Sequence, residues 1–199
     1  MPAPLNIDCF RNTEAAFDPS YAFNAAKADD YYAQAAGIKY GNAGMFNPRR
    51  IHLSLADGYY RFCDSKRPNP AGGWWTDHAT FLRVQSAAQN FQTIKDFAAS
   101  HGESPLAYSA KLHFAIPYEW GDCGHVVFAF LTARMDAYRG KGNIAFLDND
   151  PSKHDPRDGG AKYIPLQLPE LFQLFIPDAH VHFSRAFNVV KQGPASLFM

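Results

Sequence analysis

The segment GYYRFCDSKRPNPAGGWWTD, residues 58–77, decides how this sequence is interpreted. An aromatic run with a single arginine, Arg61, leads into a loop that ends in two glycines, two adjacent tryptophans and a threonine. Aromatic residues favour strands, and the sequence rich in Pro, Asn and Gly between the two runs favours a loop. We therefore predict two short strands joined by a loop, with Arg61 projecting from one face of the first strand.

A helix over about 77–100 is predicted to follow this segment. Its apolar residues recur at steps of three and four, which places them on one helix face: Val84, Ala87, Phe91, Ile94 and Ala98. The side chain of Thr76 or Asp77 can cap the first turn, because its oxygen accepts a hydrogen bond from a free backbone N–H. The pair His101-Gly102 is predicted to end this helix.

Beyond Pro105 the alternation of apolar and polar residues predicts mostly strands. The run HVVFAFLTARM is almost continuously apolar, so it is predicted to be a central strand covered on both faces. The predicted strands include residues 107–116, 125–135, 171–177 and 180–190. A regular alternation of strands with long helices is missing, which argues against a doubly wound parallel fold. The predicted class is α+β, with a mostly antiparallel sheet or two packed sheets.

The N-terminal quarter is interpreted as a lead-in rather than a separate domain. Residues 1–50 are rich in Ala, Asn, Asp and Tyr and are expected to be partly helical, with residues 37–50 as a loop. Residues 51–199 are then predicted to form one α+β domain, a size that buries a core without disulfides.

Composition excludes several classes of partner. The 199 residues carry a formal net charge of zero, so we predict no nucleic-acid partner. No apolar run is long enough to cross a bilayer, and the first residues lack the pattern of a signal peptide. The protein is therefore expected to be cytoplasmic, or exported without a cleavable signal peptide. Its three cysteines, Cys9, Cys63 and Cys123, form no disulfide framework.

Residues 58–77 also carry the side chains best suited to a ligand. The guanidinium of Arg61 can grip a phosphate or carboxylate through two parallel hydrogen bonds. Gly73 permits close approach to the main chain, and Trp74 and Trp75 offer flat faces for a ring. Thr76 lies near a helix start, where free N–H groups favour anions. Each feature also has a structural interpretation: an arginine paired with an acid, tryptophans filling a core, and a plain helix cap.

Together, these elements resemble the opening of the ADP-ribosyltransferase-like fold. There an arginine on the first core strand holds NAD, and a second strand, aromatic and then Ser or Thr, supports the nicotinamide pocket. YYRF matches the first element, GGWWT the second, and TDHATFLRVQSAAQNF the following helix. The resemblance implies a mostly antiparallel split β-sheet core, with NAD bound by Arg61, Gly73, Trp74, Trp75 and Thr76.

The resemblance also implies a glutamate at the start of a later strand, where its charge stabilises the reacting ribose carbon. The nearest match is PELFQLFIPDAHVHF, but the residue at that place is Gln173, and Glu170 lies three positions earlier. Glutamine keeps hydrogen bonding and loses the charge, which weakens electrostatic catalysis. Either Glu170 acts from a shifted register, or the pocket binds without much turnover, or the match is misaligned. Arg61, Glu170 and Gln173 are the catalytic candidates.

The activity implied is cleavage of the nicotinamide–ribose bond of NAD, by ADP-ribosyl transfer or by hydrolysis. The acceptor would be a protein or a small molecule. A small transferase of this kind suits a toxin or effector, which can have an inhibitor protein as a partner. This follows from the family and not from the residues themselves.

Two further functions stay open. The domain can be a non-catalytic module that binds a ligand or a protein through its aromatic surface. It can also be a cysteine peptidase or amidase, with Cys123 as nucleophile and His180 or His182 as base. The β-rich run after Cys123 instead favours an inert cysteine in a turn before a strand.

No metal site is predicted. His180 and His182 would share one face of a strand, but no metal-binding spacing of Cys or His accompanies them. Glu119 and Asp122 are a candidate carboxylate pair for glycosidic chemistry, although nothing in the sequence fixes their separation.

Overall fold

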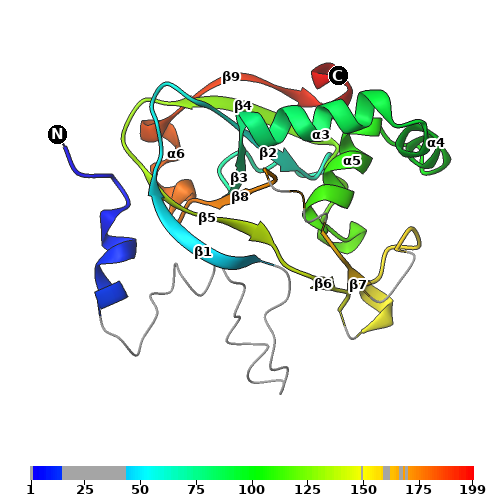
Figure 1. Cartoon of the computed structure of the whole chain (residues 1–199), viewed down its shortest axis with the longest axis horizontal. Coiled ribbons are helices and arrows are strands. Elements are labelled where there is room, and N and C mark those ends of the chain that lie inside the picture. The colour runs from blue at the N-terminus through cyan, green and yellow to red at the C-terminus, as the bar shows by residue number, and fades with distance from the viewer. Residues whose placement is uncertain (1, 15–43, 149, 159–161, 166–167, 169) are drawn as a thin grey trace.

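A seven-stranded antiparallel sheet forms the centre of the molecule (Figure 1). The structure is a computed structural model, and it describes residues 2–14, 44–148, 150–158, 162–165, 168 and 170–199. The strand order is β1-β5-β8-β3-β2-β4-β9. These strands are β1 (Met45–His52), β2 (Gly58–Cys63), β3 (Trp74–Asp77), β4 (His125–Leu131), β5 (Asp136–Gly142), β8 (Gln173–Phe175) and β9 (Phe187–Pro194). The fold class is α+β, as predicted.

Helices and a small ribbon complete the described part of the chain. The α-helices are α3 (His78–Asn90), α4 (Gln92–Ser100), α5 (Pro105–Phe114) and α6 (Ala179–Ala186). Short 3-10 helices are η1 (Ile7–Glu14), η2 (Tyr118–Trp120), η3 (Pro151–Lys153) and η4 (Ala195–Phe198), and β6 (Ala145–Phe146) pairs with β7 (Lys162–Tyr163). Among the described residues, no helix is long and apolar enough to span a bilayer.

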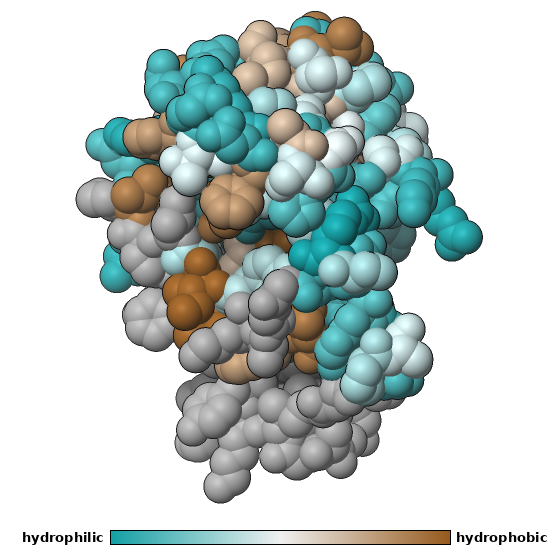
Figure 2. All heavy atoms as spheres, turned by 90° about the vertical axis from the view of Figure 1, so that its right-hand side faces the viewer, coloured by the Kyte–Doolittle hydropathy of each residue, from teal (hydrophilic) through white to brown (hydrophobic). Residues whose placement is uncertain are grey.

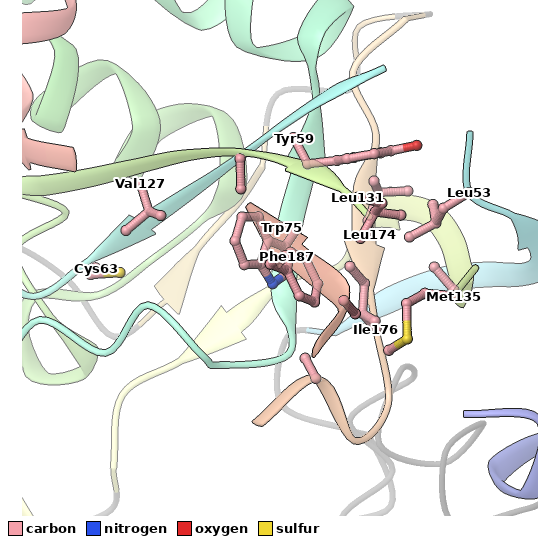
Figure 3. Close-up of a cluster of buried hydrophobic side chains, with 14 residues drawn as sticks. Leu53, Tyr59, Cys63, Trp75, Val127, Leu131, Met135, Leu174, Ile176 and Phe187 are labelled. Atoms are coloured by element: carbon pink, nitrogen blue, oxygen red, sulfur yellow. The ribbon is translucent and has the colours of Figure 1, made fainter. Parts of the chain in front are cut away.

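Both faces of the sheet are covered by apolar side chains. The α3 and α5 helices pack on one face, in a cluster that includes Tyr60, Phe81 and Val126. The α6 helix packs on the other face, with Trp75 and Val127 (Figure 3). Val126 and Val127 are adjacent and both 0% exposed, so β4 is buried on both sides. This confirms the prediction of a central strand.

The short strand β3 joins two parts of the sheet. It pairs with β2 through Tyr59–Asp77 and Tyr60–Thr76, and with β8 through Trp74–Phe175 and Trp75–Leu174. The three strands β1, β5 and β8 lie on one side of this joint, and β2, β4 and β9 lie on the other. The whole sheet therefore depends on a strand of four residues.

The predicted helix over 77–100 is interrupted. It begins as predicted, with Asp77 Oδ1 accepting a hydrogen bond from Thr80 N at 2.8 Å, but Phe91 is extended and separates α3 from α4. The Asn90 amide donates to Ser86 O at 2.9 Å, a local bond that competes with helix continuation. The end of the molecule that carries α4 shows hydrophobic and hydrophilic side chains intermingled (Figure 2). Phe91 is 61% exposed there.

Three predictions of local structure were wrong. Residues 105–114 form helix α5, not a strand, because Ser104 caps the first turn and Pro105 occupies a first-turn position. Residues 179–186 form α6, and only the residues after it form a strand. The strand β1 begins at Met45, inside the segment predicted as a loop, and runs past residue 50, the end of the expected lead-in. Residues 15–43 of that lead-in lie outside the described residues.

The buried carboxylate of Asp136 ties the N-terminal segment and β1 to β5. It accepts hydrogen bonds from Arg50 Nε at 2.7 Å and pairs with His52 Nδ1 at 2.6 Å. Its backbone also bonds to the amide of Asn6, which reaches Pro177 O at 3.0 Å. The carboxylate is 0% exposed, whereas the His52 side chain is 81% exposed.

We expect Asp136→Asn to lower the free energy of unfolding by about 3 kcal/mol, because a neutral amide does not compensate the charge of Arg50 and turns an N–H toward one of the two side-chain partners. Urea denaturation would measure the change. The control is Asp57→Asn at an exposed site, expected to stay within about 0.5 kcal/mol of the wild type. Equal stability of the two variants would contradict this role for Asp136.

Candidate functional site

The side chain of Arg61 stabilises the loop between β2 and β3 through hydrogen bonds. Its Nε donates to Asn69 O and its Nη1 donates to Trp74 O, both at 2.7 Å. The guanidinium lies against Gly72, where an added Cβ would come within 2.0 Å of Nη2. An alanine at this position would have to displace the guanidinium.

The charge of Arg61 has no acidic partner among the described residues. Burial lowers the pKa of its guanidinium, and the opposing influences come from the thiols of Cys63 and Cys123 rather than from a carboxylate. A buried cation without a counter-ion is costly, so such a group favours an anion nearby. The structural interpretation of an arginine paired with an acid does not apply within the described part of the chain.

The two tryptophans project to opposite faces of the sheet. Trp75 is 3% exposed and stacks on Phe187 with ring centroids 4.9 Å apart, and its Nε1 donates to Gly72 O at 2.7 Å (Figure 3). Its indole therefore fills the core. Trp74 is half-buried and tilts against Phe175 at 5.1 Å, so it is the indole of the pair with exposed surface.

Gly73 and Thr76 hold β3 against β8. A Cβ at Gly73 would lie 2.9 Å from the ring of Phe175, so only glycine permits this approach without displacement. Thr76 is 2% exposed and its hydroxyl donates to Phe172 O at 3.2 Å. Asp77, not Thr76, caps α3. Both residues were predicted to bind the cofactor, and in the structure both stabilise the pairing of β3 with β8.

Gln173 and Glu170 occupy different surroundings. The Gln173 Nε2 donates to Phe114 O at 3.3 Å and fixes the side chain against the end of α5. The Glu170 carboxylate forms an ion pair with Arg83 of α3, and both side chains are largely exposed. Neutral Gln173 is therefore half-buried, and charged Glu170 is on the surface.

The structure brings the three predicted segments together. Arg61 on β2, Trp75 on β3 and Leu174 on β8 lie in one row across neighbouring strands, although β8 follows β3 by about a hundred residues. Because successive residues of a strand alternate faces, Gln173 lies beside Thr76 on the opposite face. Arg61 and Gln173 are thus close along the sheet, but their side chains project from different faces.

A polar group that the sequence analysis missed borders β3 and β8. The Arg139 guanidinium lies over the ring of Phe172, 3.5 Å from its centroid, and 3.6 Å from the Asp77 carboxylate. No local motif marks Arg139, because it is one of several scattered cations in the sequence. Only the pairing of β5 with β8 reveals its place.

The geometry does not favour a cysteine nucleophile. Cys123 has a positive φ of 54° in the irregular segment just before β4, and it is 3% exposed. Burial raises the pKa of its thiol to about 12, which disfavours the reactive thiolate. Cys123 packs in the cluster under α3 and α5, whereas His180 and His182 are on α6, which packs on the opposite face.

The candidate carboxylates Asp122 and Glu119 accept hydrogen bonds from backbone N–H groups of the fold. Asp122 accepts hydrogen bonds from Ser65 N and Gly124 N, both at 2.8 Å, and Glu119 accepts one from Asp148 N at 2.9 Å. His180 and His182 were predicted to share a strand face, which is wrong: they belong to a helix, where residues two apart do not face each other. Within the described residues, no group of three or more His, Cys, Asp or Glu is arranged to hold a metal ion.

Comparisons with protein-family models, curated proteins and solved structures returned no match to this chain. The arguments about function therefore depend on the geometry of the site.

Arg61 and Gly72 are expected to be energetically coupled. Arg61→Ala removes the side-chain donor to Trp74 O and one of the two donors to Asn69 O, which Cys63 Sγ also reaches at 3.3 Å. It should lower the free energy of unfolding by about 2 kcal/mol. Gly72→Ala should cost about 1–3 kcal/mol by displacing the guanidinium. Once Arg61 is alanine, the glycine substitution should cost less than about 0.5 kcal/mol, and a double-mutant cycle in urea measures this. Additive effects would show that the contact does not order the loop.

All three thiols should resist alkylation in the folded protein. Burial raises the pKa of Cys9 and of Cys123 to about 12 and also raises that of Cys63. At about pH 8 the native thiols stay protonated, whereas the unfolded chain has ordinary thiols that react. Mass spectrometry after iodoacetamide treatment, with and without urea, checks this. Rapid native labelling of Cys123 alone would revive the peptidase hypothesis.

Proposed function

We propose that the chain binds NAD at the β2–β3–β8 unit and cleaves the nicotinamide–ribose bond, transferring ADP-ribose to an acceptor or to water. The observation that carries the proposal is the adjacency of these three strands at the centre of the sheet. They hold the arginine, the aromatic-threonine segment and the glutamine-containing segment that resemble the ADP-ribosyltransferase-like fold. The β3 and β8 strands, far apart in sequence, are hydrogen-bonded neighbours in the sheet.

In this proposal each residue has a defined part. Arg61 projects from the face opposite to Gln173, and its part is to order the loop that ends at β3. Trp74 is the indole with exposed surface for the nicotinamide ring. Gly73 and Thr76 hold β3 against β8 and so fix the wall behind that ring.

The reacting carbon would be served by Gln173 or Glu170. The amide nitrogen of Gln173 is committed to Phe114 O, so its oxygen is the atom that can accept from a ribose hydroxyl. It brings no negative charge to an oxocarbenium-like centre, and catalysis should be slow for that reason. Glu170 carries the charge, but Arg83 holds it at the surface.

Gln173→Glu should therefore increase nicotinamide release from NAD by about 10²-fold, because a carboxylate replaces a neutral amide at the reacting centre. Arg61→Ala should abolish release, and Glu170→Gln should reduce it if Glu170 supplies the charge in the wild type. Chromatographic detection of nicotinamide measures all four proteins. The control is Arg67→Ala, at an exposed arginine on the same loop, which should leave the rate unchanged.

Circular dichroism would confirm that each variant is folded. Absence of NAD binding and of nicotinamide release in both the wild type and Gln173→Glu would refute the proposal.

A second candidate is a non-catalytic ligand-binding domain. It is favoured by the neutral Gln173 and by the ion pair that occupies Glu170. Saturable binding of NAD without turnover, in the wild type and in Gln173→Glu alike, would select this function.

A further inference from the structure

The strand β1 is an edge of the seven-stranded sheet, and among the described strands it pairs with β5 alone (Figure 1). Leu53 N donates to Met135 O at 3.0 Å, which continues this antiparallel ladder. Because the ladder alternates along a strand, the N–H and C=O groups of Arg49 point toward β5, and those of Arg50 and His52 point outward. Within the described residues, no hydrogen bond reaches these outward groups. They are a template to which an extended segment can add as a further strand.

Cations line one face of the sheet beside this edge. Arg49 of β1 pairs in register with Arg139 of β5, and Lys141 follows two residues later on the same face. Directly opposed side chains lie about 5 Å apart at Cβ, where like charges destabilise a sheet. In the described part of the chain, neither the exposed Arg49 nor Lys141 has an acidic partner. Arg139 has one, the Asp77 carboxylate at 3.6 Å, so the cations outnumber the acids.

This cationic face is opposite to the face proposed to hold NAD. Arg139 pairs with Leu174 of β8, and the adjacent Gln173 projects from the other side of the sheet. Ile51, two residues from Arg49, packs against the core cluster that contains Leu174. The group that compensates these cations is therefore separate from the proposed nucleotide.

The charge of β1 decides which kind of strand can add to it. A second copy of this chain, paired edge to edge through β1, would bring its own Arg49 beside the same row of cations, and like charges in neighbouring strands repel. The bulge between Phe46 and Arg49 and the ring of Pro48 limit the regular edge to the residues that follow. A segment with carboxylates at alternate positions instead places one about 5 Å from Arg49 at Cβ, as an opposite-charge pair.

We propose that β1 is the docking edge for an extended acidic segment of a partner protein. The main chain of this segment bonds to the outward groups of Arg50 and His52, and its carboxylates face Arg49, Arg139 and Lys141. The bound carboxylates relieve the repulsion between Arg49 and Arg139. The proposal does not depend on NAD binding, because it uses the edge and the opposite face of the sheet.

Fluorescence anisotropy with labelled peptides tests this proposal. The probe is a peptide of alternating Glu and Thr, and the control peptides alternate Lys with Thr, or Glu with Pro, which cannot donate main-chain hydrogen bonds. We expect only the Glu–Thr peptide to bind, and raised salt to weaken it. Arg49→Glu and Lys141→Glu should each weaken its binding by about tenfold. Lys66→Glu, at an exposed lysine on the loop after β2, is the matched control and should bind as the wild type does.

A backbone substitution separates strand addition from attraction between charges alone. His52→Pro removes an outward N–H and leaves the three cations in place, so it should abolish peptide binding. His52→Ala loses the same imidazole but keeps the N–H, and it should bind as the wild type does. Circular dichroism would show that both variants are folded.

The proposal is overturned if the wild type does not bind the Glu–Thr peptide, or if Arg49→Glu binds it equally well. Equal binding of the Glu–Pro peptide would also overturn it, because charge alone would then suffice. Sedimentation velocity tests the other occupant: a wild-type dimer that His52→Pro dissociates would assign the edge to a second copy of this chain. None of these measurements involves NAD, so the proposed function stands or fails separately.

Discussion

The fold depends on the pairing of the four-residue strand β3 with both of its neighbours. Two residue pairs join it to β2 and two join it to β8, and these contacts unite the strands on either side into one sheet. So short a strand tolerates little error in register, because a slip of one residue would reverse which side chain enters the core. Trp75 sets the register by filling the core beside Phe187, and Gly73 permits the close approach of Phe175.

Arg61 extends this constraint into the preceding loop. Its two hydrogen bonds to carbonyls join β2 to the residues that lead into β3. Because both partners are neutral carbonyls, the guanidinium charge has no carboxylate partner among the described residues. One side chain therefore orders the local backbone and places a positive charge there.

Charge is distributed unevenly along the sheet although the whole chain is neutral. Asp136 compensates the charge of Arg50 and hydrogen-bonds with His52 on one face of β1 and β5. On the other face, Arg49 and Arg139 oppose each other with less compensation. The two faces of the same strand pair thus differ in how fully their arginines are compensated.

The sequence by itself determined the strands around Arg61, the central strand β4 and the capped start of α3, because these follow from local periodicity and turn chemistry. It also contained the signals for α5, Ser104 and Pro105, although alternation over residues 107–116 suggested a strand. Only the tertiary structure decided that β8 lies beside β3, that Trp75 rather than Trp74 is in the core, and that Arg139 meets Arg49. Strand pairing joins residues far apart in the chain, and a periodic pattern shows which faces alternate but not which strand lies next to which.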